Sequence, residues 1–274
     1  MRPTQGIPVR LLLALILAGY AGLAQAASLS IDTGHGTATL STQQLLARPD
    51  LRTIDVPADV SYQKAMRYKA VPLKALLAGV PADAHLQFTA LDGFAAEIPA
   101  GFVLDGHGAE AWLAVEDAAW PALGDGKPSA GPFYLVWLHP EAGKVGPEQW
   151  PYQIASIRVL ADPALRFPLM RPAPGLAKDS PVMRGFKVFQ KNCITCHTLN
   201  GQGDAKLGPD LNIPHSPTEY LREGMLRVLV RNPQDLRHWP QAKMPGFSAQ
   251  VISDADLANL EAYLKHMAGR KATP

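Results

Sequence analysis

Both cysteines of this 274-residue chain lie in one short motif, Cys193-Ile194-Thr195-Cys196-His197. Cysteines three residues apart on a helical turn project the same way, so two thiols can add to the two vinyl groups of one haem. His197, four residues after Cys193, falls on the same side and can ligate the iron. The spacing therefore predicts one covalent haem c, with Cys193 and Cys196 as thioether links and His197 as the proximal iron ligand.

Three other chemistries use cysteines at this spacing. Zinc would need further ligands from distant parts of the chain, and two cysteines exclude a Cys₄ site or a four-cysteine iron–sulfur cluster. A dithiol redox pair would use the Cys-x-x-Cys alone, and the same thiols can form a structural disulfide. These alternatives stay open beside haem, which we favour because it also accounts for the histidine.

Electron-transfer haems usually carry histidine and methionine as axial ligands, which makes the methionines candidates for the distal position. Met244 lies in a predicted loop, and Pro245 disfavours helical geometry for the residue before it. A loop methionine can reach back over the haem, so Met244 is the predicted distal ligand. The other candidates are the helical Met225 and Met267, and the loop histidines His215 and His238.

The region that carries the motif, residues 180–274, has the pattern of a helical domain. Ser180-Pro181 predicts a helix start, as do Ser216-Pro217 with Glu219 and Ser253 with Asp256. The second helix is expected to end before Pro233. The apolar stripe of the last helix consists of Leu257, Leu260, Leu264 and Met267.

Residues 28–160 have a β-rich pattern. We predict short helices over 42–47 and 72–78, and strands over 29–32, 37–40, 53–56, 85–90, 95–98, 112–115, 133–138 and 154–160. The histidines of this region (His35, His85, His107 and His139) are expected in turns or at the surface. Six of its acidic residues could suggest paired carboxylates, and solvated loop charges explain them as well: Asp92, Glu97, Asp105, Glu110, Glu116 and Asp117.

Two further segments complete the organisation of the chain. Residues 161–179 hold four prolines, which predicts a stiff, extended linker that belongs to neither core. Residues 1–26 combine Arg2 and Arg10 with an apolar run and a small-x-small site at its end, a pattern typical of a secretion signal. We expect cleavage after Ala26 and a periplasmic protein, with membrane attachment only if the signal stays uncleaved.

The region from Ser180 to Met267 resembles the class I cytochrome c family. Gly185 and Phe189 match the first helix of that family, and Tyr263 holds the matching aromatic position on the last helix. Gly208-Pro209-Asp210-Leu211 matches the loop after the haem motif, and Met-Pro at 244–245 matches the distal loop. The resemblance implies that the Pro209 carbonyl accepts a hydrogen bond from His197.

The region from Val56 to Leu160 resembles the molybdopterin-binding domain of the sulfite oxidase family. The resemblance is carried by Tyr68-Lys69-Ala70-Val71-Pro72-Leu73, Leu91-Asp92-Gly93-Phe94, Ile98-Pro99, Gly126-Lys127-Pro128, Gly131-Pro132-Phe133-Tyr134-Leu135-Val136 and Trp150. Family enzymes hold molybdenum through a cysteine in the region that corresponds to residues 59–67, which has no cysteine here. We therefore expect no molybdopterin, and expect a fold kept for docking a redox partner or binding another ligand.

These observations predict an α+β chain with two domains, a β-rich sulfite-oxidase-like domain followed by an all-α cytochrome c domain. Residues 28–179 carry 12 Lys and Arg against 16 Asp and Glu, whereas residues 180–274 carry 12 against 8. The net charge of +2 gives no reason to expect nucleic-acid binding. We predict an electron carrier with protein redox partners. The alternatives are a molybdopterin oxidoreductase that feeds its own haem and a haem-based gas sensor.

Overall fold

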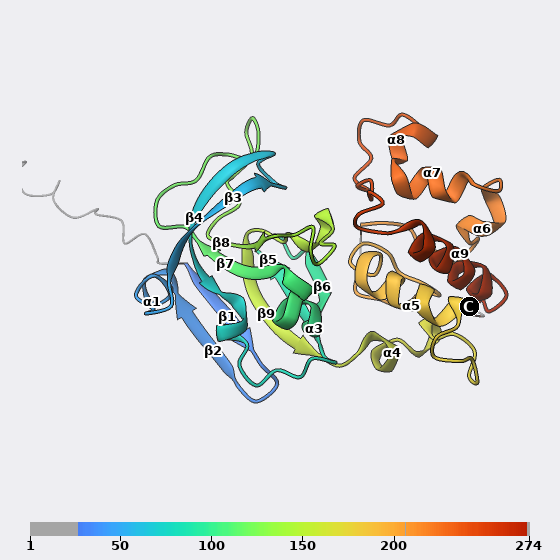
Figure 1. Cartoon of the computed structure of the whole chain (residues 1–274), viewed down its shortest axis with the longest axis horizontal. Coiled ribbons are helices and arrows are strands. Elements are labelled where there is room, and N and C mark those ends of the chain that lie inside the picture. The colour runs from blue at the N-terminus through green and yellow to red at the C-terminus, as the bar shows by residue number, and fades with distance from the viewer. Residues whose placement is uncertain (1–26, 206, 273–274) are drawn as a thin grey trace, which may run out of the picture.

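The computed structural model describes residues 27–205 and 207–272, which fold around two separate hydrophobic cores (Figure 1). One core lies in the β-rich region up to Leu160, and the other lies in the helical region from Ala164 to Met267. Within the described ranges, no helix is both long and apolar enough to cross a membrane. The predicted secretion signal, residues 1–26, lies outside these ranges.

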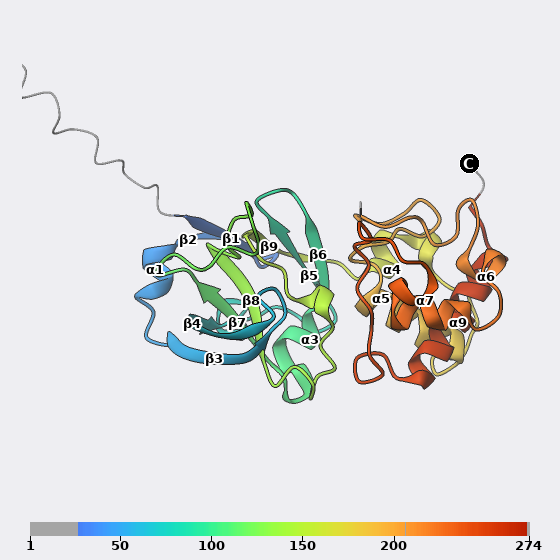
Figure 2. The same cartoon turned by 90° about the horizontal axis from the view of Figure 1, so that it is seen from above.

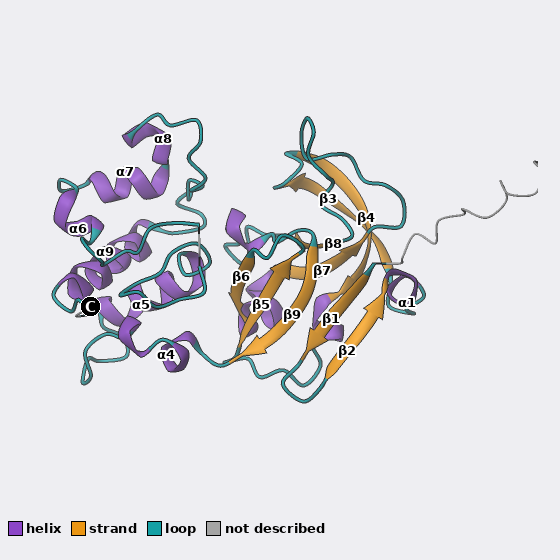
Figure 3. Cartoon of the chain, turned by 180° about the vertical axis from the view of Figure 1, so that it is seen from behind, coloured by secondary structure: helices purple, strands orange, loops and turns teal. Residues whose placement is uncertain are grey.

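The β-rich region is built from two sheets (Figure 3). The first has the order β2-β1-β9-β5-β6, and the second has the order β3-β4-β7-β8. Their bounds are β1 Ser28–Asp32, β2 Thr37–Ser41, β3 Arg52–Asp59, β4 Lys64–Pro72, β5 His85–Ala90, β6 Ala95–Pro99, β7 Glu110–Val115, β8 Phe133–Leu138 and β9 Ile154–Leu160. Strand β1 runs parallel to β9, and the other pairs are antiparallel.

The β-rich core lies between these sheets and is closed by short helices. Strand β8 is a continuous apolar run whose first five residues are all buried, and Trp137 on it is 1% exposed. The short helices are α1 Thr42–Leu46, α2 Leu73–Leu76 and α3 Ala100–Asp105. Strand β4 was not predicted, and Pro72 is its last residue and the cap of α2 rather than a residue inside the helix.

Two helices form the centre of the helical region, α5 Pro181–Asn192 and α9 Asp254–Ala268. Ser180 and Ser253 cap them as predicted, and the predicted apolar stripe of α9 is fully buried. The helices cross closely at Gly185, where an added Cβ would lie 1.9 Å from the backbone oxygen of Asn259. A glycine at this position therefore lets the two backbones touch.

The predicted second helix of this region is broken into pieces. Helix α6 (Pro217–Tyr220) starts with the expected capping box, but the chain leaves helical geometry at Leu221. Helix α7 (Met225–Arg231) begins after Gly224, whose φ of 79° is left-handed and favours glycine. Asn232 then caps a further short helix, α8 (Pro233–Leu236).

The segment 161–179 differs from the predicted extended linker (Figure 2). It forms α4 (Pro163–Arg166) and a 3₁₀ turn over Pro168–Met170. Met170 is completely buried in the helical core, and its carbonyl accepts a 2.7 Å hydrogen bond from the Tyr263 hydroxyl. The prolines thus start short helical turns here, and the segment packs as part of the helical region.

Candidate functional site

The Cys193–His197 motif continues the last turn of α5. The amide of Cys193 donates to the Phe189 carbonyl at 2.9 Å, and the amide of His197 donates to the Cys193 carbonyl at 2.9 Å. The amide of Cys196 donates to that same carbonyl at 3.1 Å. These bonds wind the two cysteines and the histidine into one turn. Both cysteines are free thiols and half-buried, so the structure does not pair them in a disulfide.

The ring of His197 is fixed by the loop that follows the motif. Its Nδ1 lies 2.8 Å from the Pro209 carbonyl, which is the hydrogen bond that the family resemblance implies. Because a carbonyl only accepts, Nδ1 carries the proton, and Nε2 is left with a lone pair for a metal. An added Cβ at Gly208 would lie 2.5 Å from the ring carbon Cε1, so only glycine leaves room for the ring there.

Asp210 holds this loop in shape. Its carboxylate accepts hydrogen bonds from the amides of Asn200 at 3.1 Å and Gly201 at 2.7 Å. It also accepts from the amides of Asn212 and Ile213, both at 2.8 Å. Four backbone donors therefore fix the residue that directly follows Pro209.

Burial dominates the electrostatics of the motif. It lowers the pKa of His197, against the opposing hydrogen bond to Pro209, and so favours the neutral ring that can bind a metal. It raises the pKa of Cys193 and raises that of Cys196 to about 11. The next cause at both cysteines is the negative charge of Glu148, a residue of the β-rich region. Free thiols in this setting are poor nucleophiles, because burial and the charge of Glu148 both disfavour the thiolate.

The rival distal ligands differ in their surroundings. Met244 lies outside any helix and is half-buried against the helical core, whereas His215 and His238 are exposed. Met267 is 1% exposed inside that core, and Met225 begins α7. The residues therefore fit a covalent haem: two thiols on one turn, an imidazole oriented through Nδ1 and a loop methionine against the same core.

Residues 182–268 match the family model of cytochrome c. The C-terminal region is a cytochrome c domain. Such a domain implies covalently attached haem c, which agrees with the prediction from Cys193, Cys196 and His197. No curated protein matches the chain.

The β-rich region outside the cytochrome c domain holds a different buried cluster. Asp59 is 2% exposed, and its carboxylate accepts from the hydroxyls of Tyr68 at 2.8 Å and Tyr134 at 3.2 Å. The amides of Ser61 and Tyr62 donate to it as well, both at 2.9 Å. The stretch 59–67, where the sulfite oxidase resemblance would place a metal-binding cysteine, is thus the β3–β4 turn with the first residues of β4, and a saturated carboxylate holds this turn. Among the described residues, no three His, Cys, Asp or Glu side chains gather as a metal site.

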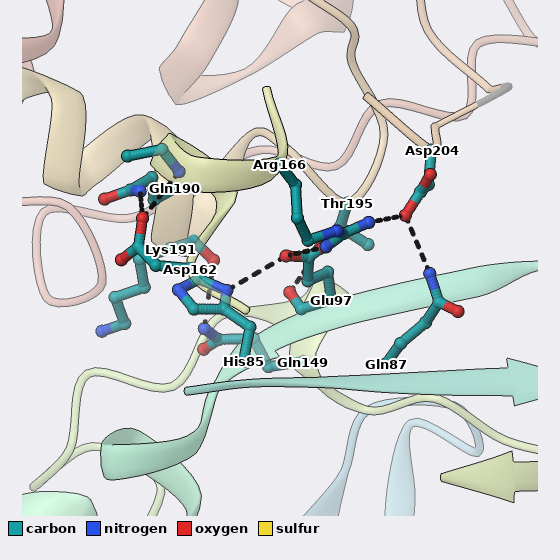
Figure 4. Close-up of polar contacts among 11 residues, drawn as sticks. His85, Gln87, Glu97, Gln149, Asp162, Arg166, Gln190, Lys191, Thr195 and Asp204 are labelled. Carbon is teal, nitrogen blue, oxygen red and sulfur yellow. Dashed lines mark hydrogen bonds and ion pairs between the residues drawn. The ribbon is translucent and has the colours of Figure 1, made fainter. Parts of the chain in front are cut away.

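A second cluster, which the sequence did not predict, joins the β-rich region to the cytochrome c domain (Figure 4). Glu97 is 3% exposed and accepts from Nη1 of Arg166 at 2.9 Å through both oxygens, while Nδ1 of His85 lies 3.2 Å away. Arg166 also pairs with Asp204, which accepts from Gln87 at 3.0 Å.

Two expectations about this cluster were wrong. His85 is 4% exposed rather than a surface residue, and Glu97 lies on β6 rather than in a solvated loop. Gln87 pairs with Glu97 in the β5–β6 register, so His85, two residues earlier, shares their face of the sheet. The alternation of side chains along β5 was the one available signal that His85 and Gln87 share a face of the sheet. Nothing local in the sequence shows that the cytochrome c domain covers this face.

Proposed function

We propose that the chain is an exported cytochrome with one haem, which carries single electrons between redox proteins. Cys193 and Cys196 form the thioether links, His197 is the proximal ligand and Met244 is the distal ligand. The observation that carries this proposal is the orientation of His197. Its Nδ1 bond to Pro209 leaves Nε2 with a lone pair for a metal, within one turn of both cysteines.

The ligand set defines what the residues do. Haem c supplies a one-electron couple between ferric and ferrous iron. The Pro209 carbonyl orients the imidazole and raises its basicity, and a thioether ligand favours a higher reduction potential. His197 and Met244 would hold the haem iron from the chain, and the iron would then have no ligand position left for a substrate. Electron transfer then needs only a partner close to the domain surface.

We further propose a docking or ligand-binding role for the β-rich domain, with the fold of the sulfite oxidase family and without molybdenum. The support is the cysteine-free stretch 59–67 and the saturated Asp59 carboxylate within it. The opposite net charges of the two regions also favour an electrostatically guided encounter with a redox partner.

The absorption spectrum and the metal content of protein purified from its native host test the proposal. We expect stoichiometric iron without molybdenum, and an oxidised spectrum with a sulfur-to-iron charge-transfer band at the red end. Met244→Ala should abolish this band. The control Met225→Ala removes a thioether that lies at the start of α7 and should leave the band intact.

Each part of the proposal can fail separately. A band that survives Met244→Ala would remove Met244 as the ligand. Stoichiometric molybdenum would support the oxidoreductase alternative. Carbon monoxide binding to the reduced wild type at neutral pH would indicate an open distal position, as a gas sensor requires.

A further inference from the structure

The β-rich domain contacts the haem-attachment segment directly. The Thr195 hydroxyl, inside the motif, donates to the Glu97 carbonyl at 3.0 Å (Figure 4). Just before the motif, the Lys191 carbonyl accepts from the Gln149 side chain at 3.3 Å, and the side-chain Nδ2 of Asn192 donates to Oε1 of Glu148 at 2.9 Å. Thr195 is 2% exposed, so this face of the motif is closed to solvent.

Glu148 differs from the other residues of this contact because it places a carboxylate in the interface whose oxygens are not all hydrogen-bonded. It lies on a 3₁₀ turn, Pro147–Gln149, between β8 and β9. Its Oε2 is buried and has no hydrogen-bond partner, while Oε1 has only the neutral amide of Asn192. The carboxylate folds back over Gly146, where an added Cβ would lie 2.2 Å from Oε2. The missing side chain at position 146 thus makes room for the carboxylate in the interface.

Lys191, whose charge acts on Glu148, does not pair with it. The ammonium of Lys191 donates to the carbonyls of Lys144 at 2.9 Å and Gly143 at 3.4 Å, and lies 4.3 Å from the centre of the Phe102 ring. No ion pair between Glu148 and a cation is present among the described residues. Glu148 is half-buried, with Oε2 shielded from solvent. A carboxylate that is shielded in this way and has no cationic partner acts over longer distances than an exposed one, since water screens it less.

The field of Glu148 reaches both sulfur atoms of the motif. Its charge is the next cause, after burial, of the raised pKa values of Cys193 and Cys196. In the haem-loaded protein these sulfurs are bonded to the edge of the porphyrin, so a charge felt at both of them is also felt by the haem. This step depends on the haem attachment given under the proposed function.

We propose that Glu148 tunes electron transfer through its charge: the carboxylate, supplied by the β-rich domain, lowers the reduction potential of the haem group. A negative charge stabilises the ferric state, which carries one more positive charge than the ferrous state. Two unit charges about 10 Å apart, at an effective dielectric constant of about 20, interact by roughly the energy of a tenfold change in an equilibrium constant. We therefore expect about a tenfold effect, which is about 59 mV for one electron.

The same placement couples reduction to proton uptake. Burial raises the pKa of Glu148 to about 7, against the opposing effects of the Asn192 hydrogen bond, its own backbone amide and the Lys191 charge. Other charges near the pair are Lys144 on the same connection and Asp256 on α9, which both act on Lys191. When one electron arrives from a partner, the loss of positive charge favours binding of one solvent proton to the Glu148 carboxylate. The potential should therefore fall as the pH rises through neutrality.

Redox titration of the purified, haem-loaded full chain from pH 5 to pH 9 tests the proposal. Glu148→Gln should favour reduction about tenfold at pH 9, where the wild type is charged, and should flatten the pH dependence around neutrality. The matched control is Glu141→Gln, which neutralises an exposed carboxylate on the same β8–β9 connection. This control should change the equilibrium less than twofold.

A third variant separates charge from packing. Glu148→Asp keeps the charge and should retain a pH-dependent potential, whereas a purely structural role would make it behave like Glu148→Gln. Equal potentials for the wild type and Glu148→Gln at pH 9 would overturn the inference, as would equal effects of both Glu148 variants. Absence of covalent haem from the wild type would instead refute the proposed function.

Discussion

Replacement of Gly185 by alanine sets two effects of opposite sign against each other. Alanine is the better helix former, by about 1 kcal/mol in a helix interior, and propensity alone predicts stabilisation. At this crossing, however, the new Cβ would lie 1.9 Å from the Asn259 oxygen and 2.8 Å from Cβ of Tyr263. Favourable heavy-atom contacts need about 3.5 Å, so α5 and α9 would have to separate by about 1.5 Å.

The free-energy cost of separating the two helices exceeds the gain from the higher helix propensity of alanine. Overpacking of a well-packed core typically costs about 1–3 kcal/mol, and here the obstacle is backbone rather than a movable side chain. Separation would also loosen Tyr263 from Phe186 and Phe189, whose ring centres lie 5.3 and 5.5 Å from its own. We expect net destabilisation of about 1–3 kcal/mol, and a melting temperature lower by about 4–8 °C per kcal/mol for a domain of this size.

Thermal unfolding of the haem-loaded chain, followed by circular dichroism at 222 nm, measures this effect. The matched control is Gly269→Ala at the end of α9, where the nearest atom to an added Cβ is 3.7 Å away and φ is −79°. The control should melt within a few degrees of the wild type. An unchanged or higher melting temperature for Gly185→Ala would show that the helices accommodate a side chain and would refute the packing argument.

Two further predictions concern the loop beside His197. Gly208→Ala places a Cβ 2.5 Å from the His197 ring, so we expect displacement of the ring from Pro209 and a lower haem-to-protein ratio; full loading with an unchanged spectrum would contradict this. Burial alone would raise the pKa of Asp210, but its backbone donors outweigh this and hold the pKa below its usual value. The stabilisation by the ionised Asp210 carboxylate is therefore fully present at pH values above the usual pKa of an aspartate. It is lost as the pH falls through the lower pKa that Asp210 has in the folded protein. Asp210→Asn should cost about 1–3 kcal/mol at pH 7, and denaturant unfolding should show the difference shrinking in acid.

Local signals in the sequence predicted much of the fold. The serine caps Ser180 and Ser253 predicted the starts of α5 and α9 correctly, because an N-cap depends on residues only three apart. The missed strand β4 carried a readable signal as well. Met66, Tyr68 and Ala70 on Lys64–Pro72 are each more buried than the residue before them, which is the period of a half-buried strand up to the buried Val71. The break at Gly224 likewise had a glycine to mark it.

The errors that no local signal could prevent all lie where the two cores meet. The segment 161–179 was predicted to be a spacer from its prolines, but Met170 fills the helical core and Arg166 reaches Glu97. The haem motif itself was predictable because its chemistry needs a fixed spacing within five residues. Which face of that motif the β-rich domain covers depends on contacts nearly 100 residues apart, such as Thr195 with Glu97.

Two glutamates of the β-rich domain enter this interface, and their surroundings give them different roles. Both oxygens of Glu97 are bound by Arg166, which neutralises its charge locally, and removing Glu97 would leave the half-buried Arg166 guanidinium with Asp204 as its remaining acidic partner. Glu148 has one neutral donor and one unpartnered oxygen. Its removal leaves no opposite charge behind, and its presence leaves a field that extends to the cysteines. Glu97 is therefore suited to holding the domains together, and Glu148 to acting on the haem across the interface.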